Sequence, residues 1–531
     1  MPCPPIRPRA LSAAAIVAAL AFLLAHPTDL AAHAAPMSPA PQTAAKKATP
    51  KRQTPVRRVA ARRPSAPAQP SWTSPHGTPQ LVADMTDMLN RRVKGGQFGV
   101  MVVSLTRGDT LFSQYAGEMM QPASTMKLYT TAVALERFGP DHTFSTDVLR
   151  DGAVAANGTV SGNLYLRADG DPSMSARFYK DPNLPMASLA QSVAASGVKT
   201  VTGDLVYDAT AFDDQLVPDG WKAKNLGASY SARVSALSLN ENLVWVVVNP
   251  AGKVAQVTLE PATTTIPVRS TVRLVAGRRG RITARKAIDG GIDVSGTIGS
   301  GSGPLRYSLV VDDPALFTAG ALRAALQNVG VTVAGTIRPA PTPATAVKLA
   351  GLVSPPLSQI VSEMNRESIN IVAELLYRDA ARAVAPGGMS SAQAGLGNLR
   401  EFMTRKVGAN AEEVRVSDGS GLSTFDYLTP RSMIQLLSYA HKGPWSSAFH
   451  GSLPVAGESE LLRRRMRGTP AEGNLHAKTG TTDVVVGLGG YVTAKNGEIV
   501  AFSFIYNGRD KWNAKSAMDA IGATLANFVR E

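Results

Sequence analysis

In residues 80–531, apolar side chains recur with a helical period near both ends of this region. Residues 81–89 place them on one helical face, whereas 98–105 and 110–112 are runs of strand length. Residues 124–138 again have helical spacing. Gly139-Pro140 is typical of a helix end, because Gly can take up the left-handed cap and Pro cannot continue the helix. The pattern predicts helix, two strands and helix.

The middle of the chain has a different pattern. Residues 146–352 are rich in Val, Thr, Gly and Asp and contain short strand-like runs, among them 162–166, 203–207 and 243–248. One helical segment, 314–329, interrupts them. We therefore expect an inserted, mostly β module over 146–352, built as one unit or as two subdomains.

Helices return towards the end of the chain, at 357–384, 394–406 and 512–529. Before the last of them, residues 487–493 and 499–506 flank Asn496-Gly497, a dipeptide that favours the type I′ turn of a β-hairpin. Strands at both ends of the patterned region are thus flanked by helices. This arrangement predicts one sheet built from both ends, in a domain formed by residues 80–145 and 353–531.

The first 34 residues resemble a secretory signal. Arg7 and Arg9 precede an apolar run over 11–25, and Ala32-His33-Ala34 is a small-x-small cleavage signal. The run is short for a membrane span, which needs about 20 residues. An uncleaved anchor is the alternative. We expect an exported protein, periplasmic or secreted and associated with the cell envelope.

Charge is concentrated in the next segment. The whole chain has a formal net charge of +15, and residues 35–79 contain eight basic and no acidic residues. Their Pro- and Ala-rich composition predicts a disordered linker. It is either a solvated spacer or an electrostatic contact to anionic cell-envelope polymers. Because a tail supplies most of the charge, the high isoelectric point does not indicate nucleic-acid binding.

The composition also limits the chemistry. Cys3 is the one cysteine, so neither an intrachain disulfide nor a multi-cysteine metal site can form. The seven histidines show no HExxH spacing. We expect neither a metal nor another cofactor.

Ser124 and Lys127 form an SxxK motif at the start of the predicted helix 124–138. Spacing of three residues puts both side chains on one helical face. A serine needs a neighbouring base to become a nucleophile, and a lysine with a lowered pKa can be that base. The alternative is a helix-capping serine beside a solvated lysine.

Two further motifs occur later in the chain. Ser368 and Asn370 form an SxN before an apolar helix, which offers a second hydroxyl for proton relay and an amide for a substrate carbonyl. Lys478-Thr479-Gly480-Thr481 precedes the terminal hairpin and offers a cation for a carboxylate. Each motif alone has a structural explanation, a cap or a turn. All three in this order are typical of β-lactamases and penicillin-binding proteins.

With these motifs, the chain resembles the D-alanyl-D-alanine carboxypeptidases/endopeptidases of the low-molecular-mass class C penicillin-binding proteins. The resemblance spans roughly 80–531 and is carried by six stretches: 122–127, 170–173, 235–240, 364–370, 417–423 and 476–481. It implies an α+β, penicillin-binding/β-lactamase-like serine transpeptidase domain, with an antiparallel sheet and helices on both faces, split by a large mostly β insert. The 241 positions between Lys127 and Ser368 fit this family and not the compact β-lactamases.

The resemblance also implies a function and residue roles. Ser124 would be acylated by D-Ala peptides of peptidoglycan, Lys127 would take its proton, and Ser368 would assist the leaving amine. Asn370 would hold the peptide. The carboxylate would be bound by three residues: Lys478, Thr479 and Thr481. β-Lactam antibiotics would be covalent inhibitors.

Two backbone N–H groups, of Ser124 and Thr481, would form the oxyanion hole, and residues 419–423 would line the cleft. Asp208 resembles an insert position that binds the amino group of a stem-peptide side chain in some relatives, and its alternative is a capping aspartate. Ile369 stands where relatives often have Asp. A β-lactamase or esterase with the same chemistry, and a catalytically idle cell-wall binding protein, are the alternative functions.

Overall fold

The computed structural model describes residues 72–385 and 389–530, which belong to one compact unit, Gln69–Glu531. The predicted signal, 1–34, and the predicted linker as far as residue 71 lie outside the described residues. Helix α1 (Thr78–Arg92) begins within the last residues assigned to that linker. No helix in the described ranges has the length and apolar content needed to cross a membrane.

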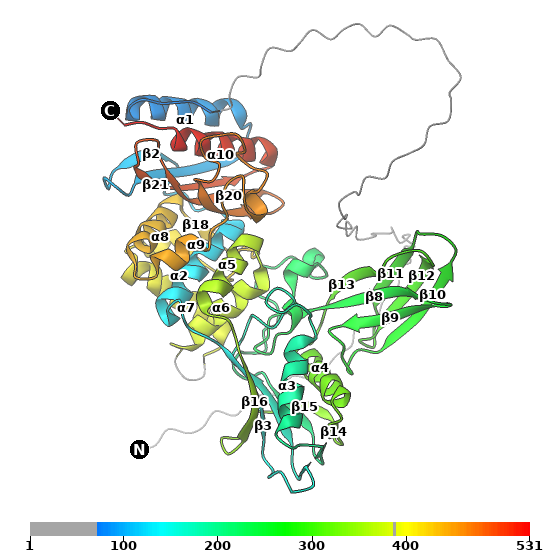
Figure 1. The fold of residues 1–531 in the computed structure, drawn as a ribbon. Coiled ribbons are helices and arrows are strands. Elements are labelled where there is room, and N and C mark those ends of the chain that lie inside the picture. Colours follow the sequence, from blue (N-terminus) through cyan, green and yellow to red (C-terminus); the bar gives the residue numbers. More distant parts are fainter. Residues whose placement is uncertain (1–71, 386–388, 531) are drawn as a thin grey trace, which may run out of the picture. The chain divides into compact units, whose positions relative to one another are not determined.

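A five-stranded antiparallel sheet joins the two ends of the patterned chain, as predicted (Figure 1). Its order is β19 (His476–Thr481), β20 (Val485–Thr493), β21 (Ile499–Asn507), β1 (Gln97–Ser104) and β2 (Thr110–Gln114). The β1–β21 register runs from Gln97 opposite Asn507 to Ser104 opposite Val500. The predicted hairpin is β20–β21, and its Gly497 has φ 83°.

Helices cover both faces of this sheet (Figure 1). On one face, α1 and α10 (Lys511–Ala526) pack together and against the strands, with Leu81, Met85 and Phe502 in a shared apolar core. On the other face, α8 (Pro430–Lys442) contacts β1 and β21. Because both faces are covered, β20 and β21 are buried along nearly their whole length, which explains their continuous apolar runs.

The second helical layer contains the motif-bearing helices. Its elements are α2 (Lys127–Phe138), α5 (Leu357–Glu367), α6 (Asn370–Arg382), α7 (Ser391–Glu401) with a π-turn at Phe402–Lys406, α9 (Ser446–Gly451), and the short strands β17 (Val414–Arg415) and β18 (Tyr427–Leu428). The helical segment predicted over 357–384 is divided into two helices, and the apolar helix expected after the SxN motif is α6. Ser368 has φ 59°, a left-handed conformation that ends α5 before α6 begins. Apolar residues continue on both sides of this break, so the periodicity did not indicate it.

A second sheet is formed by the beginning and the end of the region predicted as an insert. Its order is β15 (Ile337–Pro339), β7 (Leu205–Asp208), β5 (Leu164–Ala168), β3 (Ser145–Arg150) and β16 (Val347–Val353). Two helices, α3 (Leu184–Ala195) and α4 (Pro314–Asn328), pack together against it. The expectation of a single helix here is wrong because α3 was missed. Its buried residues Met186, Leu189 and Val193 share one face, but the opposite face has no charged residue, so the contrast between the two faces is weak.

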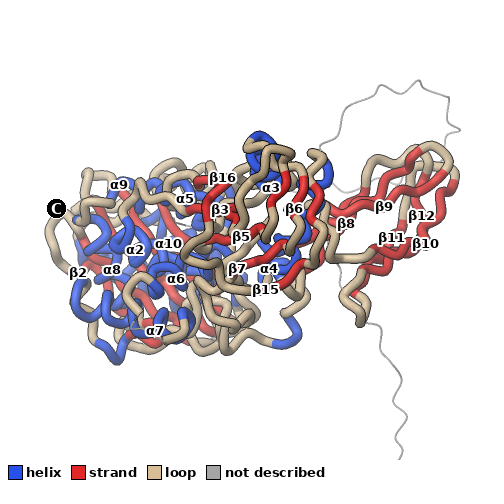
Figure 2. Tube along the Cα trace, turned by 90° about the horizontal axis from the view of Figure 1, so that it is seen from below, coloured by secondary structure: helices blue, strands red, loops and turns tan. Residues whose placement is uncertain are grey.

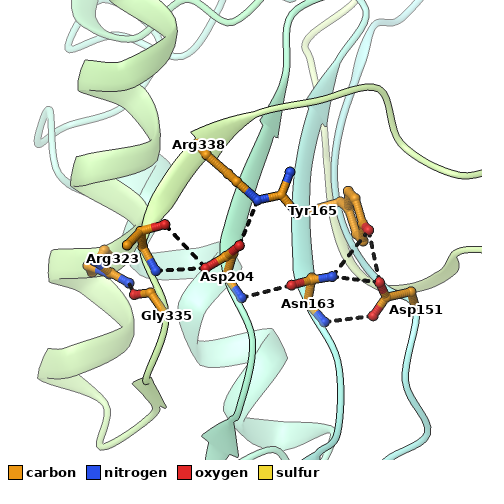
Figure 3. Close-up of polar contacts among 8 residues, drawn as sticks. Asp151, Asn163, Tyr165, Asp204, Arg323, Gly335 and Arg338 are labelled. Atoms are coloured by element: carbon orange, nitrogen blue, oxygen red, sulfur yellow. Dashed lines mark hydrogen bonds and ion pairs between the residues drawn. The ribbon is translucent and has the colours of Figure 1, made fainter.

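A threefold repeat stabilises the parallel part of this sheet. The pattern Thr-Val-x-Gly-x-(Leu/Ile) occurs at 159–164, 200–205 and 332–337. In each copy a two-residue strand, β4 (Thr159–Val160), β6 (Thr200–Val201) or β14 (Thr332–Val333), precedes β5, β7 or β15. The Asp204 N–H donates to Asn163 Oδ1 and the Thr336 N–H donates to Asp204 Oδ1, both at 2.8 Å (Figure 3). Successive copies are therefore joined by hydrogen bonds at the same position of the repeat, the residue after Gly.

The rest of the insert region consists mainly of strands and loops, with short 3-10 turns at Ala223–Asn225, Ser229–Ser231 and Asn240–Asn242 (Figure 2). One sheet has the order β13 (Leu305–Val310), β8 (Leu243–Ala251) and β9 (Val254–Glu260). The other has the order β10 (Val268–Val275), β12 (Ile292–Gly299) and β11 (Arg281–Lys286). Two structurally distinct parts within 146–352 are consistent with two subdomains, and the domain boundaries themselves stay a prediction.

Candidate active site

Ser124 and Lys127 lie where a tight turn becomes a helix. Residues Ala123–Met126 form a 3-10 turn, and α2 begins at Lys127. The Lys127 Nζ lies 3.2 Å from the Ser124 Oγ. Ala123 has φ 48°, a strained conformation for a residue with a β-carbon, and such strain is often found at functional sites. The local geometry thus brings together the two residues that the SxxK spacing singled out.

Lys127 is completely buried and surrounded by polar atoms. Its Nζ also donates to Asn370 Oδ1 at 2.6 Å and to the Ser420 carbonyl oxygen at 2.8 Å. Burial lowers the pKa of Lys127 to about 8, against the opposing effect of nearby carboxylates, the strongest of which is Asp418. With this pKa about a tenth of the amine is neutral at pH 7, and a neutral amine can accept a proton from a hydroxyl.

Three buried acidic residues accompany this lysine, and sequence reasoning missed them. Glu374, Asp418 and Asp426 are each at most 1% exposed. Burial, followed by the charge of Asp418, raises the pKa of Glu374 to about 8. Glu374 lies one helical turn after Asn370 on α6, so an acid four residues after the SxN motif was the signal available in the sequence.

Asp418 organises the loop that faces Lys127. Its carboxylate accepts hydrogen bonds from the backbone N–H groups of Ser420, Gly421 and Ser423 at 2.6–3.0 Å. It also accepts one from Trp221 Nε1 at 2.8 Å, across 197 positions of sequence. This network fixes the loop whose Ser420 carbonyl contacts Lys127. A segment of the insert region thereby supports the site.

The second motif lies between the two buried lysines. Asn370 receives the Lys127 bond and donates from Nδ2 to the Tyr230 carbonyl oxygen at 2.8 Å. The Ser368 Oγ accepts a hydrogen bond from Lys478 Nζ at 2.9 Å. Ser368 thus combines a left-handed backbone conformation with a hydroxyl that takes part in the polar network, and such strained residues are often found at functional sites.

The third motif is part of strand β19. Lys478 is fully buried, and burial, with the nearby positive charge of Lys127, lowers its pKa well below the usual value. A β-carbon at Gly480 would lie 2.8 Å from the Pro122 carbonyl oxygen and 3.1 Å from the Ser124 nitrogen. Glycine is therefore required for β19 to approach the turn that carries Ser124.

A cavity of about 380 Å³ opens above these residues. Seven of the predicted positions line it: Ser124, Ser368, Asn370, Thr481 and the three loop positions 421–423. Lys222, Asn225 and Tyr230 of the insert region form another part of its wall. Thr479 is buried in β19 and is not among the lining residues.

Within the described ranges, no group of three or more His, Cys, Asp or Glu side chains is suited to a metal ion.

Asp208 does not line this cavity. It ends β7, and its Oδ1 accepts hydrogen bonds from the backbone N–H and the hydroxyl of Thr210 at 3.0 and 2.6 Å. Its Oδ2 accepts one from the Thr342 N–H at 2.7 Å. These contacts match the capping alternative, and the substrate-binding role of Asp208 stays a prediction without structural support.

The fold is of the penicillin-binding and β-lactamase-like kind, and Ser124 lies at its cavity. The crystal structure of penicillin binding protein 4 from Haemophilus influenzae superimposes with a TM-score of 0.68 at 22% identity, covering 82% of this chain and 98% of that one. A second structure of that protein, complexed with a β-lactam, gives a TM-score of 0.63 at 23% identity, with 80% and 93% covered. These likenesses concern the fold.

Sequence comparison identifies the family. The profile of the D-Ala-D-Ala carboxypeptidase 3 (S13) family matches residues 81–528. The D-alanyl-D-alanine carboxypeptidase of Actinomadura sp. (strain R39) is 36% identical over 457 residues, which cover 82% of each protein. The D-alanyl-D-alanine carboxypeptidase of Haemophilus influenzae is 25% identical over 458 residues, covering 84% of this chain and 92% of that one. The chain belongs to the S13 family of D-Ala-D-Ala carboxypeptidases, which confirms the family resemblance.

Proposed function

We propose that this protein is a serine D,D-carboxypeptidase and D,D-endopeptidase that hydrolyses D-Ala peptide bonds of peptidoglycan. The supporting observation is the 3.2 Å contact between the Ser124 Oγ and a buried lysine amine at the cavity. The sequence of residues 1–34 supports export to the compartment where this substrate occurs.

In the proposed reaction, neutral Lys127 takes the hydroxyl proton while the Ser124 Oγ attacks the carbonyl carbon of the penultimate D-Ala. Backbone N–H groups of Ser124 and Thr481 stabilise the oxyanion. The C–N bond then breaks, and the leaving amine receives a proton through Ser368, which Lys478 orients at 2.9 Å. Water attacks the acyl ester in the second half-reaction and regenerates Ser124.

The same leaving-group step accommodates two activities. Release of a terminal D-Ala is carboxypeptidase action, and release of a cross-linked peptide is endopeptidase action, because both break the bond behind the same D-Ala carbonyl. A β-lactam presents an amide to the same nucleophile and would leave an acyl group on Ser124. A β-lactamase or esterase would hydrolyse that acyl group rapidly, whereas an idle cell-wall binding protein would release no D-Ala product.

A labelled penicillin and purified muropeptides distinguish these functions. We expect the full chain to form a long-lived adduct on Ser124, to remove one D-Ala from monomers and to cleave cross-linked dimers, as followed by mass. Ser124→Ala should abolish the adduct and both products, whereas Ser104→Ala, a buried strand serine, is the matched control. An adduct on Ser124→Ala would contradict the assignment. Rapid penicillin turnover by the wild type would favour a β-lactamase, and sacculus binding without products would favour the idle protein.

A further inference from the structure

The outer face of the β10–β12–β11 sheet is strongly basic. β12 is the central strand, with Arg269 of β10 and Arg285 of β11 both opposite its Asp293. Four residues along each outer strand, Arg273 and Arg281 are both opposite Thr297. Because side chains in register across a sheet share a face, all four arginines project from one side.

The opposite face of the same sheet is apolar and packed. Val294 and Ile298 of β12 and Ile282 of β11 belong to the buried core of the insert region. The sheet contacts β8, β9 and β13. The arginine-bearing face is therefore the solvent face, and all four of its arginines are exposed.

Most of this positive charge has no acidic partner. Residues 268–286 contain seven basic and no acidic residues. Arg269 pairs with Asp289 at 2.6 Å and with Asp293 at 2.7 Å, and Lys286 pairs with Asp312 at 2.6 Å. Among the ion pairs of the described residues, none includes the other five: Arg273, Arg278, Arg279, Arg281 and Arg285. The acid on this face, Asp293, is already neutralised by Arg269.

Hydroxyl groups lie between the charges. Thr271, Ser295 and Thr283 form one row across the three strands, and Thr297 separates Arg273 from Arg281. The turn between β10 and β11 adds Arg278 and Arg279, both exposed. We call the five unpaired arginines with this hydroxyl row the arginine face.

We propose that the arginine face binds a linear polyanion whose charges are phosphodiesters, as in an anionic cell-envelope polymer. Guanidinium groups match phosphate oxygens with paired N–H donors, and the hydroxyl row can donate to the remaining oxygens. Charge complementarity along two strands favours an extended chain of repeated anions. A membrane is disfavoured, because this sheet exposes just two large apolar side chains, Val275 on this face and Ile288 in the β11–β12 turn, which is little apolar area for insertion. The proposal is independent of the acyl-transfer chemistry.

Binding of the full chain to poly(glycerol phosphate) at several salt concentrations tests the proposal. The variant is Arg273→Gln/Arg281→Gln/Arg285→Gln. The matched control is Lys199→Gln/Lys253→Gln/Lys495→Gln, which removes three exposed charges outside the face. We expect at least a tenfold loss of affinity for the variant and less than twofold for the control. The slope of log affinity against log salt should fall by about one for each phosphate that the variant no longer neutralises.

Three further measurements define what would overturn the proposal. The loss of affinity caused by the arginine variant should persist when the eight basic residues between 35 and 79 are also replaced by Gln. The arginine face and that segment are separate basic regions of the sequence. If the variant and the control lost affinity equally, the effect would be one of net charge alone, and the proposal would be overturned. Binding only to phosphatidylglycerol vesicles, lost in Ile288→Ser and kept in the arginine variant, would indicate a membrane and also overturn it. Unchanged D-Ala release verifies that each variant is folded.

Discussion

Two basic regions of this protein use positive charge in opposite ways. Lys127 and Lys478 are fully buried, and each amine is held by specific hydrogen bonds from Nζ. The arginines of the arginine face are exposed on β10 and β11. Burial disfavours the charged form of an amine and lowers its pKa, whereas a guanidinium keeps its charge because its own pKa is very high.

The buried lysines and the exposed arginines also differ in the groups that surround them. Lys127 is accompanied by buried carboxylates, an amide and a carbonyl oxygen, since a buried charge without partners would be very costly. Arg273 and Arg281 have hydroxyl neighbours and water, and their charge remains available to a ligand. In our two proposals the same sign of charge serves proton transfer at one site and attraction of a polyanion at the other.

The largest effect is expected when Lys127 can no longer accept a proton. Lys127→Met should lower the rate of acylation by about 10²–10⁴-fold, the usual contribution of a general base. Lys127→Arg should be similarly impaired, because a guanidinium keeps the charge but cannot be deprotonated near neutral pH. Rates of labelled-penicillin adduct formation measure both. Near-wild-type acylation by Lys127→Arg would show that only the charge is needed.

A smaller effect is expected from the acid that faces Lys127. The acylation rate of the wild type should rise with pH through about 8, because only the neutral amine is a base and burial sets its pKa there. The negative charge of Asp418 raises the Lys127 pKa, so Asp418→Asn should move this rise to lower pH. It should also reduce the rate by disordering the loop. The pH profile of acylation measures the shift.

Trp221→Phe is the matched control for this prediction. It removes the 2.8 Å hydrogen bond to Asp418 and leaves the carboxylate in place. We expect a modest loss of rate with no shift to lower pH. A shift of equal size in both variants would mean that the loop, and not the charge of Asp418, controls the profile.

The local parts of the site could be predicted from sequence, and the long-range parts could not. Ser124 and Lys127 are three residues apart, so helical geometry alone brings them together. The contact between Ser368 and Lys478 crosses 110 positions, and only family resemblance indicated it. The hydrogen bond between Trp221 and Asp418 had no sequence signal, because it depends on how the insert region folds against the loop.

The fold shows the same division. The central sheet was predicted because its strands are apolar and the Asn496-Gly497 turn is distinctive. Helix α3 was missed because its exposed positions hold leucine, glutamine, serine and alanine and no charged residue, which weakens the amphipathic pattern. The break at Ser368 was missed because its left-handed conformation depends on contacts that lie far away in the sequence. The arginine face was not recognised, since its register appears only once the strands are paired.

The smallest effect concerns the stability of the arginine face. Arg273→Gln/Arg281→Gln/Arg285→Gln should change the free energy of unfolding by no more than about 0.5 kcal/mol per residue, because exposed side chains without ion pairs contribute little. Urea unfolding of the full chain, compared with the Lys199→Gln/Lys253→Gln/Lys495→Gln control, measures this. A loss of several kcal/mol would mean that these arginines hold the sheet together. A neutral result, combined with weaker polyanion binding, would show that their charge serves a ligand and not the fold.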